Sequence, residues 1–254
     1  MKVLKLACAA LLAVFSAQAA AVGGLADVTL FDRSEGRQLP VYWHEGRAYV
    51  VGKPGNEYQL SVRSRQGEEV LAVMSVDGVN IISGETATTQ QSGYVLSPWR
   101  ALEVKGWRKD LSRTAAFYFT SLPDSYAART GRPDNVGAIG VALFRKKRPE
   151  PPADVSMLSR QAPASAGAAR AEAENRSADQ SEKLGTGHGR SETSHARQVG
   201  FERATSEPAE TVVLYYDSYR NLLARGIVPP IPQQVQPRRP SPSPFPGFVA
   251  DPPA

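Results

Sequence analysis

Two tryptophan–arginine pairs are the groups in this sequence best suited to binding a ligand. Trp99 and Arg100 precede a short alternating segment, and Trp107 and Arg108 follow it. Exposed tryptophan and arginine make strong contacts with proteins and sugars through ring faces, cation–π pairs and N–H donors. We therefore predict these four residues as a ligand-binding surface. The alternative is that the indole rings belong to the core.

The segment between the two pairs predicts which way each indole points. Leu102 and Val104 alternate with charged residues, so they face the core of a half-buried strand. Trp107 does not share their parity and should lean to the outer face, unless a bulge shifts the register. Trp99 follows Pro98 in a predicted loop, where either orientation fits.

A second polar group lies around an Asp-Gly pair. Asp77, Asn80 and Glu85 fall within nine residues and could present oxygen ligands to a cation or a sugar. Their spacing matches no EF-hand loop. We favour the other interpretation, in which Asp77 serves its turn while Asn80 and Glu85 face solvent.

The three histidines do not indicate a metal centre. A three-histidine zinc site would need all of His44, His188 and His195. The first lies at a predicted hairpin tip, and the other two lie in a segment predicted to be disordered. The glycines around His188 would need a strand before them and a helix after them to bind a dinucleotide. We predict a flexible or tightly turned loop there, and neither a metal nor another cofactor.

Catalytic motifs are not evident in the sequence. It has no Gly-x-Ser-x-Gly elbow and no Walker-type phosphate loop, and its 25 acidic residues form no specific pair. The single cysteine, Cys8, precludes a disulfide framework and a cysteine-based zinc site. The enzyme question stays open, and a non-catalytic role is favoured.

The charge argues against nucleic acid as a partner. The chain has a formal net charge of +5. Residues 26–148 carry 17 basic and 13 acidic residues, a balance of +4 that is scattered along the segment. A nucleic-acid footprint requires a stronger and more clustered basic surface.

The N-terminus has the order of features typical of a signal peptide. Residues 1–5 are basic, residues 6–15 are apolar, and small residues follow up to Ala21. The apolar run is shorter than the ~20 residues that span a bilayer. We predict that residues 1–21 are a signal peptide cleaved near Ala19 or Ala21, and that the mature protein is periplasmic or secreted, without a transmembrane helix.

The elements that position the tryptophans belong to a predicted β domain at residues 26–148. Residues 57–63 alternate cleanly, residues 69–76 are almost wholly apolar, and residues 136–144 carry two apolar faces. Glu45-Gly46 and Asp77-Gly78 sit between apolar runs and predict tight hairpins. Short strands at this spacing predict an all-β fold, an antiparallel β-sandwich or an open barrel.

Three further segments follow the domain. Residues 149–198 contain no Phe, Tyr or Trp and predict a disordered linker. Residues 199–228 predict a strand followed by a short helix, which must dock on the sandwich because it is too small to fold alone. Its alternation suits addition to a sheet edge. Residues 229–254 include ten prolines and predict a disordered tail.

Several stretches of the sequence carry a resemblance to a group of other proteins: residues 75–85, 93–96, 106–109, 125–133 and 135–142, with 185–189 and 201–203. In these stretches the chain resembles uncharacterised exported proteins of Gram-negative bacteria. The resemblance covers about three fifths of the chain. It implies export and a shared β domain, and it carries no activity or catalytic residue.

Together these features predict an exported, non-catalytic binding or assembly module of the cell envelope. Its partner would be an envelope protein or a glycan. The alternative is a hydrolase that acts on a cell-wall or carbohydrate substrate through acidic residues on the sandwich loops. The oligomeric state is open.

Overall fold

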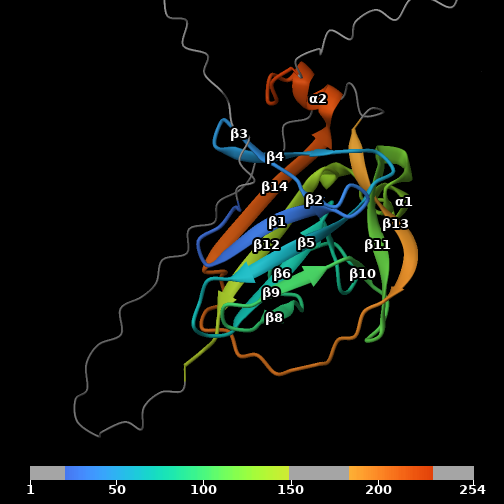
Figure 1. The fold of residues 1–254 in the computed structure, drawn as a ribbon. Coiled ribbons are helices and arrows are strands. Elements are labelled where there is room, and N and C mark those ends of the chain that lie inside the picture. The colour runs from blue at the N-terminus through green and yellow to red at the C-terminus, as the bar shows by residue number, and fades with distance from the viewer. Residues whose placement is uncertain (1–20, 149–182, 231–254) are drawn as a thin grey trace, which may run out of the picture.

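Two β-sheets pack face to face in the computed structural model, which describes residues 21–148 and 183–230 (Figure 1). Sheet A consists of β1 (Ala26–Asp32), β2 (Arg37–Gln38), β5 (Glu57–Ser64), β9 (Ala101–Val104), β10 (Gly106–Arg108), β11 (Arg113–Ser121) and β13 (Leu184–Thr193). Sheet B consists of β3 (Val41–His44), β4 (Arg47–Gly52), β6 (Val70–Val76), β7 (Val79–Asn80), β8 (Tyr94–Leu96), β12 (Ala138–Arg145) and β14 (Glu210–Ser218).

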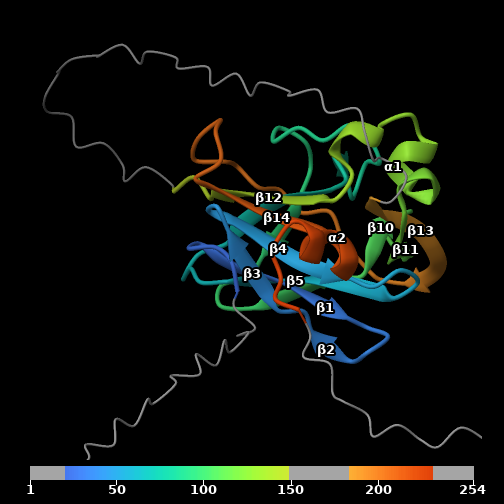
Figure 2. The same ribbon diagram turned by 90° about the horizontal axis from the view of Figure 1, so that it is seen from above.

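The helical elements are short and lie at the ends of the sandwich (Figure 2). They are η1 (Leu122–Asp124), α1 (Tyr126–Arg129), η2 (Pro133–Asn135) and α2 (Tyr219–Ala224). The two sheets do not close into a barrel, so the predicted all-β sandwich is confirmed. Among the described residues, no helix is long and apolar enough to cross a membrane.

The core lies between the two sheets and follows the sequence alternation. Tyr58, Leu60 and Val62 of β5 all point into it, as predicted. Ile139 and Val141 of β12 face them from sheet B. Each such side chain is essentially inaccessible, so the central strands are held by burial on the inner face.

Both predicted hairpins are confirmed. Glu45 and Gly46 have φ values of 49° and 72°, and Asp77 and Gly78 have values of 54° and 73°. Two successive positive φ angles are what a type I′ turn requires, and this turn matches the twist of the strands that it joins. The first turn joins β3 to β4, and the second joins β6 to β7.

The strand–helix element near the C-terminus is confirmed, but its expected position at a sheet edge is wrong. β14 lies inside sheet B, antiparallel to β12 on one side and parallel to β4 on the other. Its inward side chains Val212, Leu214 and Tyr216 are buried in the common core. Both edges of β14 are therefore paired, and sheet B is mixed rather than purely antiparallel.

The predicted linker is too long at its C-terminal end. Residues 184–193 form β13, which pairs with β11. The glycines of β13 allow close packing and do not form a loop. A Cβ at Gly187 would lie 2.2 Å from Cζ of Tyr118, and one at Gly185 would lie 2.6 Å from Cβ of Ser125. The rest of the linker (149–182), residues 1–20 of the predicted signal peptide and residues 231–254 of the tail lie outside the described residues.

Candidate binding surface

Trp99 is the most exposed large apolar side chain of the described residues, with 62% of its surface accessible. It lies in the turn between β8 and β9 and has a φ of 58°, in the left-handed region that bulky residues rarely adopt. The backbone N–H of Trp99 donates to the carbonyl of Gln66 at 3.3 Å, and the Arg100 carbonyl accepts from the backbone N–H of Ser64 at 3.0 Å. The neighbouring loop therefore holds the turn on both sides of the exposed indole.

Arg100, the next residue, is also exposed, and compensated charges flank the loop that supports this turn. The indole lies near Gly67, whose ideal Cβ position is 3.9 Å from the ring. Lys146 pairs with Glu69 at 2.7 Å, and Arg148 pairs with Glu68 at 2.9 Å. An exposed aromatic ring with a polar, charge-balanced surround has the composition of an interface hot spot.

Trp107 is buried, contrary to the prediction that it leans outward. Only 4% of its surface is accessible, and its indole N–H donates to the Gly187 carbonyl at 3.1 Å. Its ring packs against Phe117 and Tyr126. The chain leaves β9 at Lys105 and enters β10, which pairs with β11. The alternation of inward and outward side chains along β9 therefore does not continue into β10.

Arg108 ties strands together rather than facing a ligand. Its Nε donates to the Tyr94 hydroxyl at 3.0 Å, and its Nη2 donates to Oγ of Ser194 at 3.0 Å. The guanidinium also lies over the Tyr94 ring. Of the four residues predicted to form the binding surface, Trp99 and Arg100 are exposed together, whereas Trp107 and Arg108 hold the fold.

Asp77 belongs to a buried network between the sheets. Its Oδ1 accepts from the Tyr216 hydroxyl at 2.6 Å and from Gly137 N–H at 2.9 Å, and its Oδ2 accepts from Thr186 N–H at 2.8 Å. The Thr186 hydroxyl in turn bonds to the hydroxyls of Tyr216 and Tyr58. Burial raises the pKa of Asp77 to about 6, against the opposing effect of these hydrogen bonds.

Asn80 is buried as well, so the expectation that it faces solvent is wrong. Its Oδ1 accepts from the backbone N–H groups of Ile82 and Ser83, which shapes the turn after β7. Glu85 is exposed as expected. The three polar residues therefore do not converge on a common ligand, and the Asp77 carboxylate is enclosed by protein.

The histidines are also separate from one another in the fold. His44 ends β3 beside the hairpin turn, and His188 is exposed on β13 with its ring against Tyr126. Within residues 21–148 and 183–230, no group of three or more His, Cys, Asp or Glu side chains is placed to hold a metal ion.

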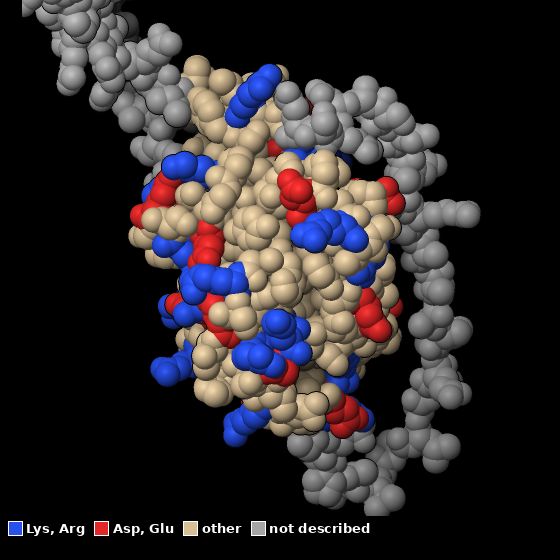
Figure 3. Space-filling view, turned by 90° about the vertical axis from the view of Figure 1, so that its right-hand side faces the viewer, with Lys and Arg blue, Asp and Glu red and all other residues tan. Residues whose placement is uncertain are grey.

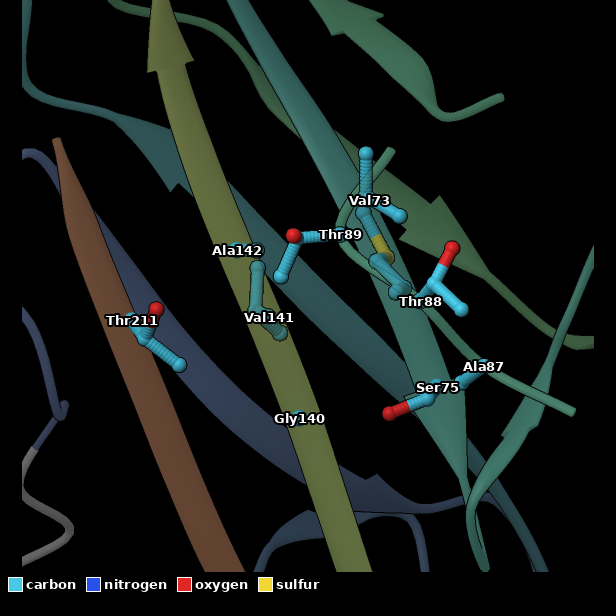
Figure 4. A pocket seen from close by; sticks show the side chains of 10 residues that line it. Val73, Ser75, Ala87, Thr88, Thr89, Gly140, Val141, Ala142 and Thr211 are labelled. Carbon is cyan, nitrogen blue, oxygen red and sulfur yellow. The ribbon is translucent and has the colours of Figure 1, made fainter. Parts of the chain in front are cut away.

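A shallow hollow of about 140 Å³ lies on the outer face of sheet B (Figure 4). Its lining contains methyl and hydroxyl groups but no ionisable side chain: Val73, Met74, Ser75, Ala87, Thr88, Thr89, Gly140, Val141, Ala142 and Thr211. Arg203 holds the Thr88–Thr89 loop by donating to the carbonyls of Thr89 and Gln91. The hollow therefore offers shape and hydroxyl groups but no general acid or base.

Basic and acidic residues are interleaved on the face shown in Figure 3, with a broad uncharged area between them.

Trp43 is a second exposed indole, 58% accessible on β3, which sequence patterning did not single out. The sequence feature that could have indicated its exposure is its position beside the predicted Glu45-Gly46 turn.

No protein-family model matches the chain, and no curated protein or solved structure matches it significantly.

Proposed function

We propose that the protein is an exported, non-catalytic binding module of the cell envelope, and that Trp99 and Arg100 form its contact surface. The observation that carries this proposal is the conformation of Trp99, a mostly exposed indole on a left-handed backbone that hydrogen bonds fix from both sides. Strained residues that are held firmly by their surroundings are concentrated at functional sites.

The chemistry of the described cavities supports binding over the hydrolase alternative. The carboxylate with the raised pKa, Asp77, is sealed between the sheets and hydrogen-bonded to Tyr216. The hollow on sheet B is lined by hydroxyl and methyl groups. A hydrolytic site needs ionisable groups that converge on an accessible pocket, and neither location provides them.

A protein is the partner class that this surface fits best. Tryptophan and arginine are the residues most enriched in hot spots of protein interfaces. The salt bridges of Glu68 and Glu69 with the basic run after β12 leave little net charge on the adjoining loop. Such a polar rim can exclude water from around Trp99 once a partner covers its indole.

Co-sedimentation with isolated envelopes tests this function. The full chain without its predicted signal peptide would be mixed with envelopes from Gram-negative cells, and the bound fraction measured against concentration. Trp99→Ala should weaken binding about thirtyfold, because losing a hot-spot side chain costs ~2 kcal/mol or more. Trp43→Ala is the matched control, since it removes an equally exposed indole from another strand.

Pretreatment of the envelopes identifies the partner class. Protease treatment should abolish sedimentation of the wild-type chain, whereas muramidase treatment should leave its binding to the remaining membrane fraction intact. The reverse result would assign a glycan partner. Equal binding by wild type and Trp99→Ala would overturn the proposed surface.

A further inference from the structure

β13 is an edge strand of sheet A. Among the described residues it pairs with β11 alone, and it lies at the outermost side of the molecule in both views (Figures 1 and 2). In its first half, the backbone N–H groups that point away from β11 already have partners, because Thr186 N–H donates to Asp77 and Leu184 N–H donates to Asp217. Ser191 in its second half is exposed. Only the second half is therefore an accessible edge.

The backbone groups of Ser191 and Thr193 point away from β11. Ser194 N–H donates to the Ser112 carbonyl at 2.7 Å, so Ser194 and Ser112 are a hydrogen-bonded pair of the ladder between β13 and β11. Hydrogen-bonded and non-bonded pairs alternate along an antiparallel ladder. Ser191 lies opposite Ala115 in a non-bonded pair, so its N–H and carbonyl face the open side. An edge of this kind is a template for a further strand.

We propose that β13 of a second copy adds antiparallel to this edge, about a two-fold axis at Ser191, to give one continuous sheet. This register places Arg190 directly opposite the partner's Glu192, and Glu192 opposite the partner's Arg190. Side chains at such non-bonded positions approach closely, so opposite charges there favour pairing. A two-fold interface must be self-complementary in this way.

Neighbouring registers lack that complementarity. An axis at Gly189 would set His188 opposite the partner's Arg190, and an axis at Thr193 would set Glu192 opposite the partner's Ser194. The register at Ser191 is thus the one in which the charged side chains match.

The charges around β13 in a single copy do not oppose pairing with a second copy. Arg190 contacts Glu57 at 2.7 Å, and Arg33 contacts Glu192 at 2.8 Å, so the cluster of two arginines and two glutamates is neutral. Arg190 also pairs with Glu192 of its own copy at 2.5 Å. The Arg190 side chain is 61% exposed and that of Glu192 is 10% exposed, so contacts across the edge would add to ion pairs that each copy already has. Because the open segment is short, we expect a weak, concentration-dependent dimer. It is independent of the contact surface proposed at Trp99.

Disulfide trapping tests the register directly. The only cysteine of the chain, Cys8, lies in the predicted signal peptide, so the mature chain offers no competing thiol. Cα atoms of a hydrogen-bonded antiparallel pair are ~5.5 Å apart, within disulfide range, so Ser191→Cys should form dimers under mild oxidation. Two Thr193→Cys thiols would be about 13 Å apart along the strands, too far to join.

The expected result is cross-linking of Ser191→Cys about tenfold faster than of Thr193→Cys, because pairing raises the effective thiol concentration. Adding Thr193→Pro to Ser191→Cys should abolish the advantage, since it removes an outward N–H that β11 does not use. Melting curves would show that these variants remain folded. Equal rates for the two cysteine variants, or an advantage that survives Thr193→Pro, would overturn the proposal.

Discussion

The hydroxyl of Tyr216 donates a 2.6 Å hydrogen bond to Oδ1 of Asp77, although 139 residues separate the two in sequence. Asp77 lies in the turn between β6 and β7, whereas Tyr216 belongs to β14, beyond the predicted linker. Thr186 of β13 contacts both residues. The segment after the linker therefore completes the core of the sandwich, and is not an appendage to it.

Asp77→Asn should lower stability, and by more at acid pH than at alkaline pH. The type I′ turn tolerates asparagine, but the amide nitrogen would face a backbone or hydroxyl donor that now bonds to the carboxylate. The pKa of Asp77 rises from its ordinary 3.8 to about 6, so the native state binds this proton more tightly than the unfolded state. Its contribution to the free energy of unfolding therefore falls as pH rises between these values, by about 3 kcal/mol.

Chemical denaturation from pH 4 to pH 8 measures this effect as the difference between wild type and Asp77→Asn. Subtracting the variant removes the opposite trend from groups whose pKa is lowered, such as Glu57. The wild type should lose its advantage progressively up to about pH 6 or 7, and the difference should then level off. A difference that grows with pH would show that the buried carboxylate stabilises the fold in its ionised form.

Cleavage in the predicted linker should leave the two fragments associated. β14 pairs on one side with β12 and on the other with β4, so its removal would expose apolar edges of both neighbours. Limited proteolysis within residues 149–182 followed by size-exclusion chromatography checks this result. Co-elution of the fragments is expected, and their separation without denaturant would contradict the integrated position of β14.

Gly187→Ala should destabilise the sandwich by about 1–3 kcal/mol, because the added methyl group overlaps the Tyr118 ring. Gly200→Ala is the matched control, since an added Cβ there meets nothing within 4 Å. Its effect should stay within about 0.5 kcal/mol. Thermal melts of both variants decide the point, and equal melting temperatures would argue against close packing at Gly187.

Trp107 should be shielded from a soluble quencher, and Trp99 should be accessible. The two indoles are 4% and 62% exposed. Acrylamide quenching of variants that retain a single tryptophan, with the others changed to phenylalanine, measures each in turn. A quenching constant for Trp107 as large as that for Trp99 would contradict the burial of β10.

Local patterns in the sequence were sufficient to predict the sandwich. Parity within a strand placed Leu60 and Ile139 correctly, and the Asp-Gly pair fixed a hairpin, because both depend on neighbouring residues alone. Parity failed at Trp107 because the chain changes partner strands at Lys105. The low aromatic content of residues 184–193 hid β13, since its packing surface comes from Tyr118 of another strand.

The candidate surface could be predicted only in part. Trp99 and Arg100 were identified from residue type, but the turn in which Trp99 has a positive φ is held by hydrogen bonds to Ser64 and Gln66, more than 30 residues away. The network of Asp77 combines residues from three strands and two turns, and short-range spacing carries no signal for it. Long-range contacts of this kind become visible only in the folded structure.

Site-specific photocross-linking in living cells tests the central claim most directly. A photoreactive phenylalanine analogue at Ser97, in the same turn as Trp99, should give a discrete ultraviolet-dependent adduct, and Trp99→Ala should abolish it. The same analogue at Gly200, where an added side chain meets open space, should give none. An adduct at Ser97 that persists in Trp99→Ala, or equal adducts at both positions, would contradict a contact surface built on Trp99.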